Sequence, residues 1–201
     1  MKKIRLGLKG LVVAALTKDV SAAMAEDNEA KVEYGEVKHL ENVQSIDLTA
    51  RTQSTNIDAD DTTDVLTECT GYDGESQRTM FTPAETAELL GEEIDDDGTV
   101  TSTEMDEPPE FAVGFQCKIR GGQILAMWLL RTKFSMNNFS AQSGGAETLN
   151  PQSDTLSFKS LTRKADGAWR RYKLVNSEEE AAAFLSKATL VKLAKKTVKE
   201  D

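Results

Sequence analysis

The segment EFAVGFQCKIRGGQILAMWLLRTKFS, residues 110–135, constrains the fold more than any other part of the chain. Two runs rich in β-branched and aromatic residues flank Gly121 and Gly122, which is the pattern of a β-hairpin with a two-residue turn. Such a turn places Phe115 opposite Trp128, and the residues that alternate with this pair are also apolar. This face of the hairpin is therefore predicted to be the core.

The other face of the second strand carries three large apolar side chains in a row, Leu125, Met127 and Leu129. A row of this kind needs cover, because exposed apolar patches are sites of association. Two covers are open at this point, an internal helix over Pro83–Leu90 or a neighbouring subunit. The three residues are accordingly candidate interaction residues.

The remaining strand signals indicate a mainly β (α+β) protein. Apolar residues at 10–16 favour a buried strand, and VQSIDLTA at 43–50 alternates with period two. Residues 65–70 and 76–81 flank the turn-like GYDG, and residues 155–175 predict a second hairpin with Asp166 and Gly167 as its turn. With about eight to ten strands and no alternating βαβ pattern, an antiparallel β-sandwich or barrel is expected.

Two helices are predicted from their caps. Thr82 and Glu85 form a capping box around Pro83, and Gly91 ends this short flanking helix. Ser177 with Glu180 begins a C-terminal amphipathic helix, with acids in its first turn and lysines at its end. The expected organisation is a β domain over residues 1–176 and this helix over residues 177–201.

A long projecting loop or hairpin is predicted at residues 50–64. Its sequence, ARTQSTNIDADDTTD, has almost no apolar residue and cannot contribute to a core. A segment of this length without a core function is a candidate contact with another subunit. The candidate interaction residues here are Gln53, Ser54, Thr55, Asn56, Ile57 and Asp58.

No residue pattern predicts catalysis, a cofactor or a metal centre, so no enzyme is expected. The segment from Glu93 to Glu104 resembles a calcium loop, but its first position is Glu and a proline pair follows in place of a helix, so a solvated acidic turn is the main interpretation. Cys69 and Cys117 lack metal-type spacing, and His39 lies in a polar stretch.

Charge and hydropathy exclude other classes. Acids number 34 against 24 basic residues, for a net charge of −10, so a basic nucleic-acid-binding surface is not expected. The N-terminus resembles a secretory signal, but the apolar run ends after about six residues, short of the roughly 7 to 15 that such a region needs. No run approaches the roughly 18 apolar residues of a membrane span.

Five pieces, in order, resemble the major tail protein (tail tube protein) family of long non-contractile-tailed phages and prophages of Gram-positive bacteria. They are GLKGLVVAALTKD, PAETAELLG, DEPPEFAVGFQCK, AMWLLRTKFS and TLSFKSLTRKADGAWR. The resemblance covers roughly residues 7–173, and the segment after residue 176 is an addition to the family pattern.

The resemblance implies a structural virion protein with the tail-tube fold. Such proteins self-assemble as stacked hexameric rings into a tube, assembled in the host cytoplasm, through which DNA passes without specific binding. The implied partners are copies of the same chain, the tape-measure protein and the terminator and baseplate proteins. Alternatives are another β-sandwich tail or head component, such as a terminator or decoration protein, or a secreted β-sandwich binding domain.

Overall fold

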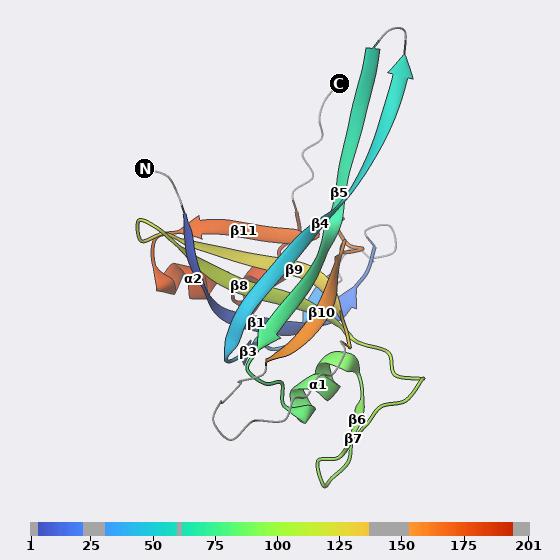
Figure 1. Cartoon of the computed structure of the whole chain (residues 1–201), viewed down its shortest axis with the longest axis vertical. Coiled ribbons are helices and arrows are strands. Elements are labelled where there is room, and N and C mark those ends of the chain that lie inside the picture. Colours follow the sequence, from blue (N-terminus) through green and yellow to red (C-terminus); the bar gives the residue numbers. More distant parts are fainter. Residues whose placement is uncertain (1–3, 22–30, 60–61, 137–152, 195–201) are drawn as a thin grey trace, which may run out of the picture. The chain divides into compact units, whose positions relative to one another are not determined.

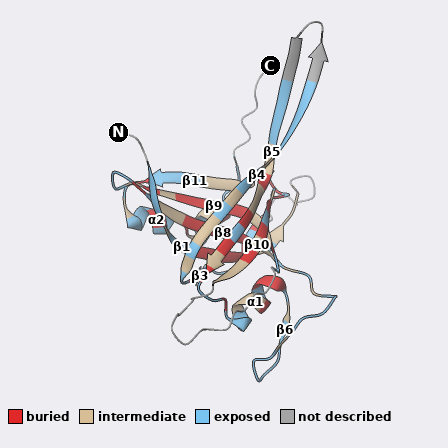
Figure 2. Ribbon diagram, viewed as in Figure 1, coloured by how far each residue is buried: buried red, intermediate tan, exposed pale blue. Residues whose placement is uncertain are grey.

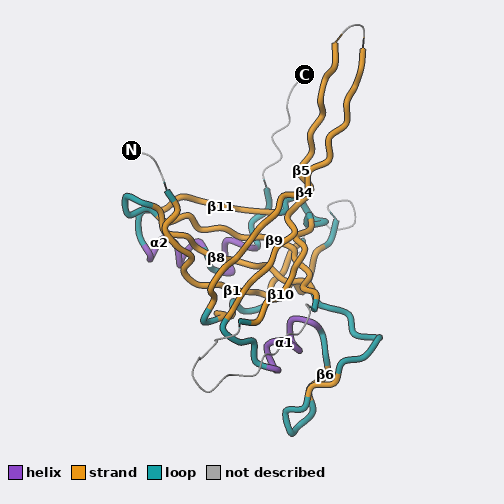
Figure 3. Tube along the Cα trace, viewed as in Figure 1, coloured by secondary structure: helices purple, strands orange, loops and turns teal. Residues whose placement is uncertain are grey.

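The fold is taken from a computed structural model that describes residues 4–21, 31–59, 62–136 and 153–194. The described part is mainly strand, with three short helices (Figure 3). The helices are α1 (Pro83–Leu90), α2 (Glu178–Phe184) and α3 (Lys187–Leu190). The strands are β1 (Arg5–Asp19), β2 (Val32–Tyr34), β3 (Lys38–Leu40), β4 (Val43–Ala59), β5 (Thr62–Arg78), β6 (Glu93–Ile94), β7 (Val100–Thr101), β8 (Glu110–Ile119), β9 (Ile124–Ser135), β10 (Asp154–Leu161) and β11 (Arg170–Val175).

The chain divides into two compact units built from interleaved segments. The first unit comprises Met1–Leu40, Glu110–Arg131 and Thr162–Asp201, and the second comprises Glu41–Pro109 and Thr132–Leu161. Strand β9 begins in the first unit and ends in the second. The boundary expected after residue 176 is therefore not where the units divide.

The first unit is an antiparallel sheet that has buried residues on both of its faces. Its strands run in the order β2-β1-β8-β9, β3 also pairs with β1, and β11 pairs with β9 (Figure 1). On one face, residues of the sheet form a cluster with residues of α2, α3 and their connection: Val12, Ala14, Ala112, Ala126, Trp128, Leu130, Ala181, Leu185 and Leu190. The Trp128 indole nitrogen donates to the Phe184 carbonyl at 3.0 Å, so this large side chain is satisfied as well as packed.

The hairpin of β8 and β9 exists, but the predicted register is wrong by one residue. The Ile119 amide donates to the Gln123 carbonyl at 2.8 Å, which leaves a loop of three residues, Arg120, Gly121 and Gly122, in place of a two-residue turn. Both glycines have positive φ. A one-residue slip moves side chains to the other face, and it places Gly114, not Phe115, against Trp128.

The close packing of Gly114 confirms this register. A Cβ at Gly114 would lie 2.7 Å from the Trp128 ring and 2.8 Å from Val12, so only glycine leaves room for the indole. Val113 and Phe115 are buried on the opposite face. The residues expected in the core are therefore in it, but on two faces of the sheet.

The second predicted hairpin, over residues 155–175, does not form. Gly167 does make a turn with positive φ, but β10 pairs with β5 while β11 pairs with β9. The turn is closed by Arg163, which is buried, donates to the Asp166 carboxylate, and donates to the Leu190 carbonyl at 2.7 Å. This arginine thus ties the turn to the end of α3.

The second unit contains the order β10-β5-β4, again antiparallel. Strand β5 runs without interruption through GYDG, so the turn expected at residues 71–74 is wrong. These glycines serve close approach: a Cβ at Gly71 would lie 2.4 Å from the Ser160 carbonyl oxygen, and one at Gly74 would lie 2.3 Å from the Phe158 ring. Single-sequence turn signals cannot distinguish this use of glycine from a turn.

The helix caps are confirmed, but the C-terminal helix is not continuous. Thr82 and Glu85 exchange both capping-box hydrogen bonds, and Gly91 closes α1 in the left-handed conformation. The Ser177 hydroxyl accepts from the Glu180 amide at the start of α2, as expected. However, α2 ends at Phe184, and α3 begins only after the extended backbone of Ser186.

Candidate assembly surfaces

The distal half of the β4–β5 hairpin pairs only with itself among the described residues. The two 17-residue strands pair with each other along their length, from Val43↔Arg78 to Ala59↔Thr62, whereas β10 pairs with β5 only from Asp73 to Arg78. The hairpin therefore continues past β10 as a two-stranded ribbon (Figure 1). The segment expected to be a projecting loop or hairpin is such a hairpin.

The ribbon is anchored where it leaves the sheet. The Arg51 guanidinium donates to the Ser160 carbonyl and lies 3.6 Å from the Asp73 carboxylate. Close by, Thr52 pairs with Cys69 while Arg51 pairs with Gly71, so the register shifts at this point. Such a bulge increases the local twist and aims the strands beyond it. The ribbon thus has a defined base on β10.

The predicted candidate residues on β4 lie on this ribbon. Gln53, Ser54, Thr55 and Asn56 are exposed (Figure 2), and the Ser54 and Thr67 hydroxyls lie 3.2 Å apart across the strands. Ile57 and Asp58 continue the pairing with Asp64 and Thr63, and their side chains lie outside the described part of the structure.

Two apolar residues of the ribbon were missed by sequence reasoning. Val65 and Leu66 on β5 are 61% and 62% exposed. Because neighbours on a strand point to opposite faces, each face of the ribbon presents one of them. The available signal is a pair of large aliphatic residues next to a segment that has no core face, whereas the sequence prediction places them only in an extended segment, residues 65–70.

The other predicted interaction residues do not form an exposed patch. Leu129 is 0% and Met127 is 8% exposed within the single chain, and Leu125 is half-buried. A neighbouring subunit is therefore not needed to cover Met127 and Leu129. The three residues lie in the first unit and α1 lies in the second, so that α1 covers them stays a prediction.

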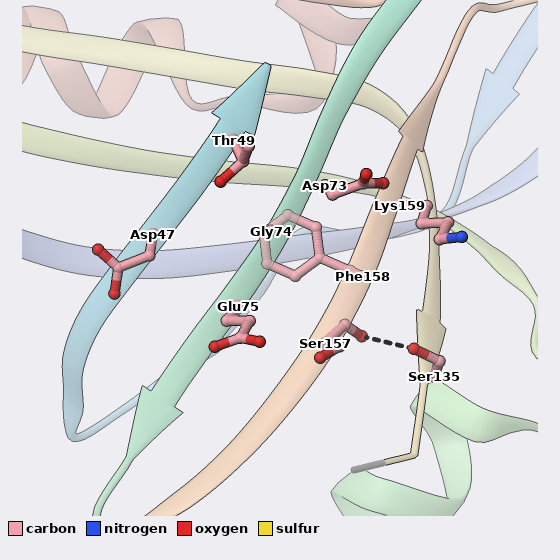
Figure 4. A pocket seen from close by; sticks show the side chains of 9 residues that line it. All are labelled: Asp47, Thr49, Asp73, Gly74, Glu75, Ser135, Ser157, Phe158 and Lys159. Atoms are coloured by element: carbon pink, nitrogen blue, oxygen red, sulfur yellow. Dashed lines mark hydrogen bonds between the residues drawn. The ribbon is translucent and has the colours of Figure 1, made fainter. Parts of the chain in front are cut away.

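An acidic hollow lies at the base of the ribbon, beside β10. Its volume is about 380 Å³, and its lining includes Asp47, Asp73, Glu75 and Lys159 (Figure 4). The Ser135 hydroxyl donates to the Ser157 carbonyl at 3.5 Å at its edge. Among the described residues, no group of three His, Cys, Asp or Glu side chains is arranged to hold a metal ion. The hollow is thus a carboxylate-rich surface.

The calcium-loop-like segment forms a small hairpin from β6 and β7. The Asp95 amide donates to the Thr99 carbonyl at 2.9 Å, and Gly98 has a φ of 85°. The Asp97 carboxylate accepts from the Thr99 amide at 3.0 Å, and this hydrogen bond lowers the pKa of Asp97. Asp97 therefore serves the turn itself.

The remaining single-residue candidates are dispersed. His39 is exposed on β3, and Cys69 and Cys117 are unpaired thiols on β5 and β8. Burial raises the pKa of Cys117, which disfavours the reactive thiolate form. No described helix is both long and apolar enough to cross a membrane.

Comparison with models of known protein families and with curated proteins finds no significant match to this chain.

Proposed function

We propose that the protein is a major tail tube protein, a structural subunit that self-assembles as stacked hexameric rings around a DNA-conducting lumen. The proposal starts from the sequence resemblance and from an antiparallel, β-rich fold. The observation that carries it is the ribbon, which offers an exposed surface that the subunit itself does not use.

The length of the ribbon suits a contact with another subunit. From Thr52 to Ala59 its arm is eight residues, which at ~3.3 Å per residue is roughly 25 Å of strand. A two-stranded ribbon of this length is marginal in water by itself. Its anchoring by Arg51 and its exposed Val65 and Leu66 favour a role as an arm that docks on a neighbouring ring.

The charge of the chain supports passage of DNA without retention. With 34 acidic and 24 basic residues, the subunit is an anion, and the hollow beside β10 adds carboxylates at the base of the ribbon. A carboxylate-bearing lumen repels phosphate and allows DNA to slide. The proposed location is the virion tail, with the tape-measure, terminator and baseplate proteins as further partners.

Shortening the ribbon tests this proposal. Because Gln53 pairs with Glu68, both arms are removed together by replacing residues 54–67 with a two-residue Asn-Gly turn. The removed part is outside the core, so the variant should fold with unchanged thermal stability. Electron microscopy should then show loss of stacked tubes.

The matched control is Met105→Ser, which changes a side chain that is 82% exposed but lies off the ribbon, and this variant should still form stacked tubes. Normal tubes from the ribbon variant would overturn the assignment of the ribbon as the inter-ring arm. A capped single ring formed by the wild type would favour a terminator, and a head-bound trimer would favour a decoration protein.

A further inference from the structure

A groove of about 900 Å³ runs along β11 in the first unit. It is lined by four consecutive residues of that strand, Arg170, Arg171, Tyr172 and Lys173, together with residues of α2, α3 and the segment after α3. Alternate side chains of a strand point to opposite faces, so a hollow lined by four in succession follows the strand's edge. Among the described residues β11 pairs only with β9, and this edge is open (Figure 1).

The groove is basic in a chain that is otherwise acidic. Arg170, Arg171, Lys173 and Lys192 line it, against the single carboxylate of Glu180. Lys173 and Lys192 are exposed, and neither forms an ion pair with a described carboxylate. The groove therefore places two ammonium groups that no described carboxylate pairs with, those of Lys173 and Lys192, beside the two arginines.

The two arginines are held in place. The Arg171 guanidinium donates to the Thr189 carbonyl at 2.9 Å and to the Lys192 carbonyl, and the Arg170 guanidinium stacks 4.5 Å from the Trp169 ring centroid and 4.9 Å from that of Tyr172. Burial, followed by the charge of Arg163, lowers the pKa of Arg171. A carboxylate entering the groove would stabilise this charged group without reorganising it.

The chain carries a matching acidic element, the turn of the β6–β7 hairpin. Its sequence EEIDDD at residues 92–97 has five carboxylates in six positions. Asp95 and Asp96 are exposed (Figure 2) and, unlike Asp97, their carboxylates make no hydrogen bond or ion pair with a described residue. The turn is closed by the hydrogen bond from the Gly98 amide to the Asp95 carbonyl, so its shape is set before any contact.

We propose that the β11 groove of one copy binds the acidic β6–β7 turn of a second copy. The two surfaces differ, so the contact is heterologous and propagates into a ring or a filament. Exposed charges dominate it, so salt should weaken it strongly. The inference shares with the proposed function only that copies of this chain associate, and it does not require a tube.

Charge reversal in full-length protein tests the contact. The groove variant is Lys173→Glu with Lys192→Glu, and the turn variant is Asp95→Lys with Asp96→Lys. All four side chains are exposed, so thermal unfolding should be unchanged. In sedimentation velocity at low salt, each variant alone should associate roughly tenfold or more weakly than wild type, because like charges then meet.

Mixing the two variants should restore association, because each reversed surface then meets its complement. The controls are Lys164→Glu and Glu41→Lys, which reverse exposed charges elsewhere and should leave association unchanged. Failure of the mixture to associate would overturn the proposal, as would a wild type that stays monomeric. The proposal would also be overturned if association were lost on Asp58→Lys, at the ribbon, but kept in the variant with Asp95→Lys and Asp96→Lys.

The outcome separates this inference from the proposed function. Normal tubes from the groove variant alone would refute the groove contact and leave the tube proposal standing. Salt-sensitive association that switches with the charges, without any tube in the wild type, would support the contact and refute the tube. Binding of free DNA by the groove in competition with the second copy would also count against the proposed occupant.

Discussion

Removing the two apolar side chains of the ribbon should weaken assembly without affecting the subunit. Val65 and Leu66 are about 60% exposed in the single chain, so Val65→Ser with Leu66→Ser removes little that folding buries. Thermal unfolding of the dissociated variant should match wild type within about 0.5 kcal/mol, as for other surface changes.

The effect on assembly follows from the area that a neighbour would cover. Full burial of a Val or Leu side chain contributes about 1.5–3 kcal/mol, so covering the exposed 60% of each contributes roughly 1–2 kcal/mol. For both residues this is roughly 2–4 kcal/mol per contact, which at about 1.4 kcal/mol per tenfold corresponds to roughly a 30- to 700-fold higher critical concentration.

The assay is the concentration at which tubes first form, measured by light scattering and checked by electron microscopy. Met105 is the matched control, because it is 82% exposed in the second unit but lies off the ribbon, and Met105→Ser should leave the critical concentration unchanged. An unchanged value for the ribbon variant would refute the claim that a neighbour buries these residues. An equal rise in the critical concentration for Met105→Ser would show that the effect is not specific to the ribbon.

Further predictions concern stability, pH and calcium. Gly114→Ala should lower the free energy of unfolding by about 1–3 kcal/mol through overpacking, whereas Gly7→Ala, with open space around it, should not; chemical denaturation measures both. Thr82→Ala should cost about 0.5–2 kcal/mol by removing a helix cap. Asp166→Asn should cost roughly 3–5 kcal/mol, because it leaves a buried guanidinium without its counter-charge. Burial alone would raise the pKa of Asp166, but the hydrogen bonds that its carboxylate accepts lower this pKa overall. The stability that the ionised carboxylate contributes is therefore full above about pH 4 and is lost as pH falls below that value. The acid-unfolding curve of Asp166→Asn should accordingly be flatter than that of wild type. Chelation of calcium should leave assembly intact, and loss of tubes would revive a calcium site at residues 93–104.

Local signals in the sequence were sufficient to predict the helix caps. The capping box at Thr82 and the stop at Gly91 depend on neighbours within the chain, and both form as expected. The polar composition of residues 50–64 likewise predicted a segment outside the core, because too few of its side chains are apolar for burial to be favourable.

The strand register and the role of two glycines could not be predicted, because both depend on contacts with residues distant in sequence. Two-residue and three-residue loops around Gly121 and Gly122 are both compatible with the sequence, and the choice moves Phe115 to the face opposite Trp128. The sequence around Gly71 and Gly74 is typical of a turn. In the structure these glycines instead leave room for Ser160 and Phe158, which lie on a strand some 85 residues away in sequence.

The candidate surfaces show the same limit. Composition identified the polar strand of the ribbon, but not Val65 and Leu66, because the sequence does not show that their strand pairs with residues 55 and 56 outside the core. The β11 groove could not be predicted either. It depends on β11 pairing with β9 instead of β10, and no local pattern encodes this choice.

The central claim is most directly tested by electron microscopy of the purified protein together with its mass in solution. The account predicts rings or tubes with six subunits per turn, in equilibrium with smaller assemblies. A strictly monomeric species at high protein concentration, with no ring or tube at any salt concentration, would contradict it.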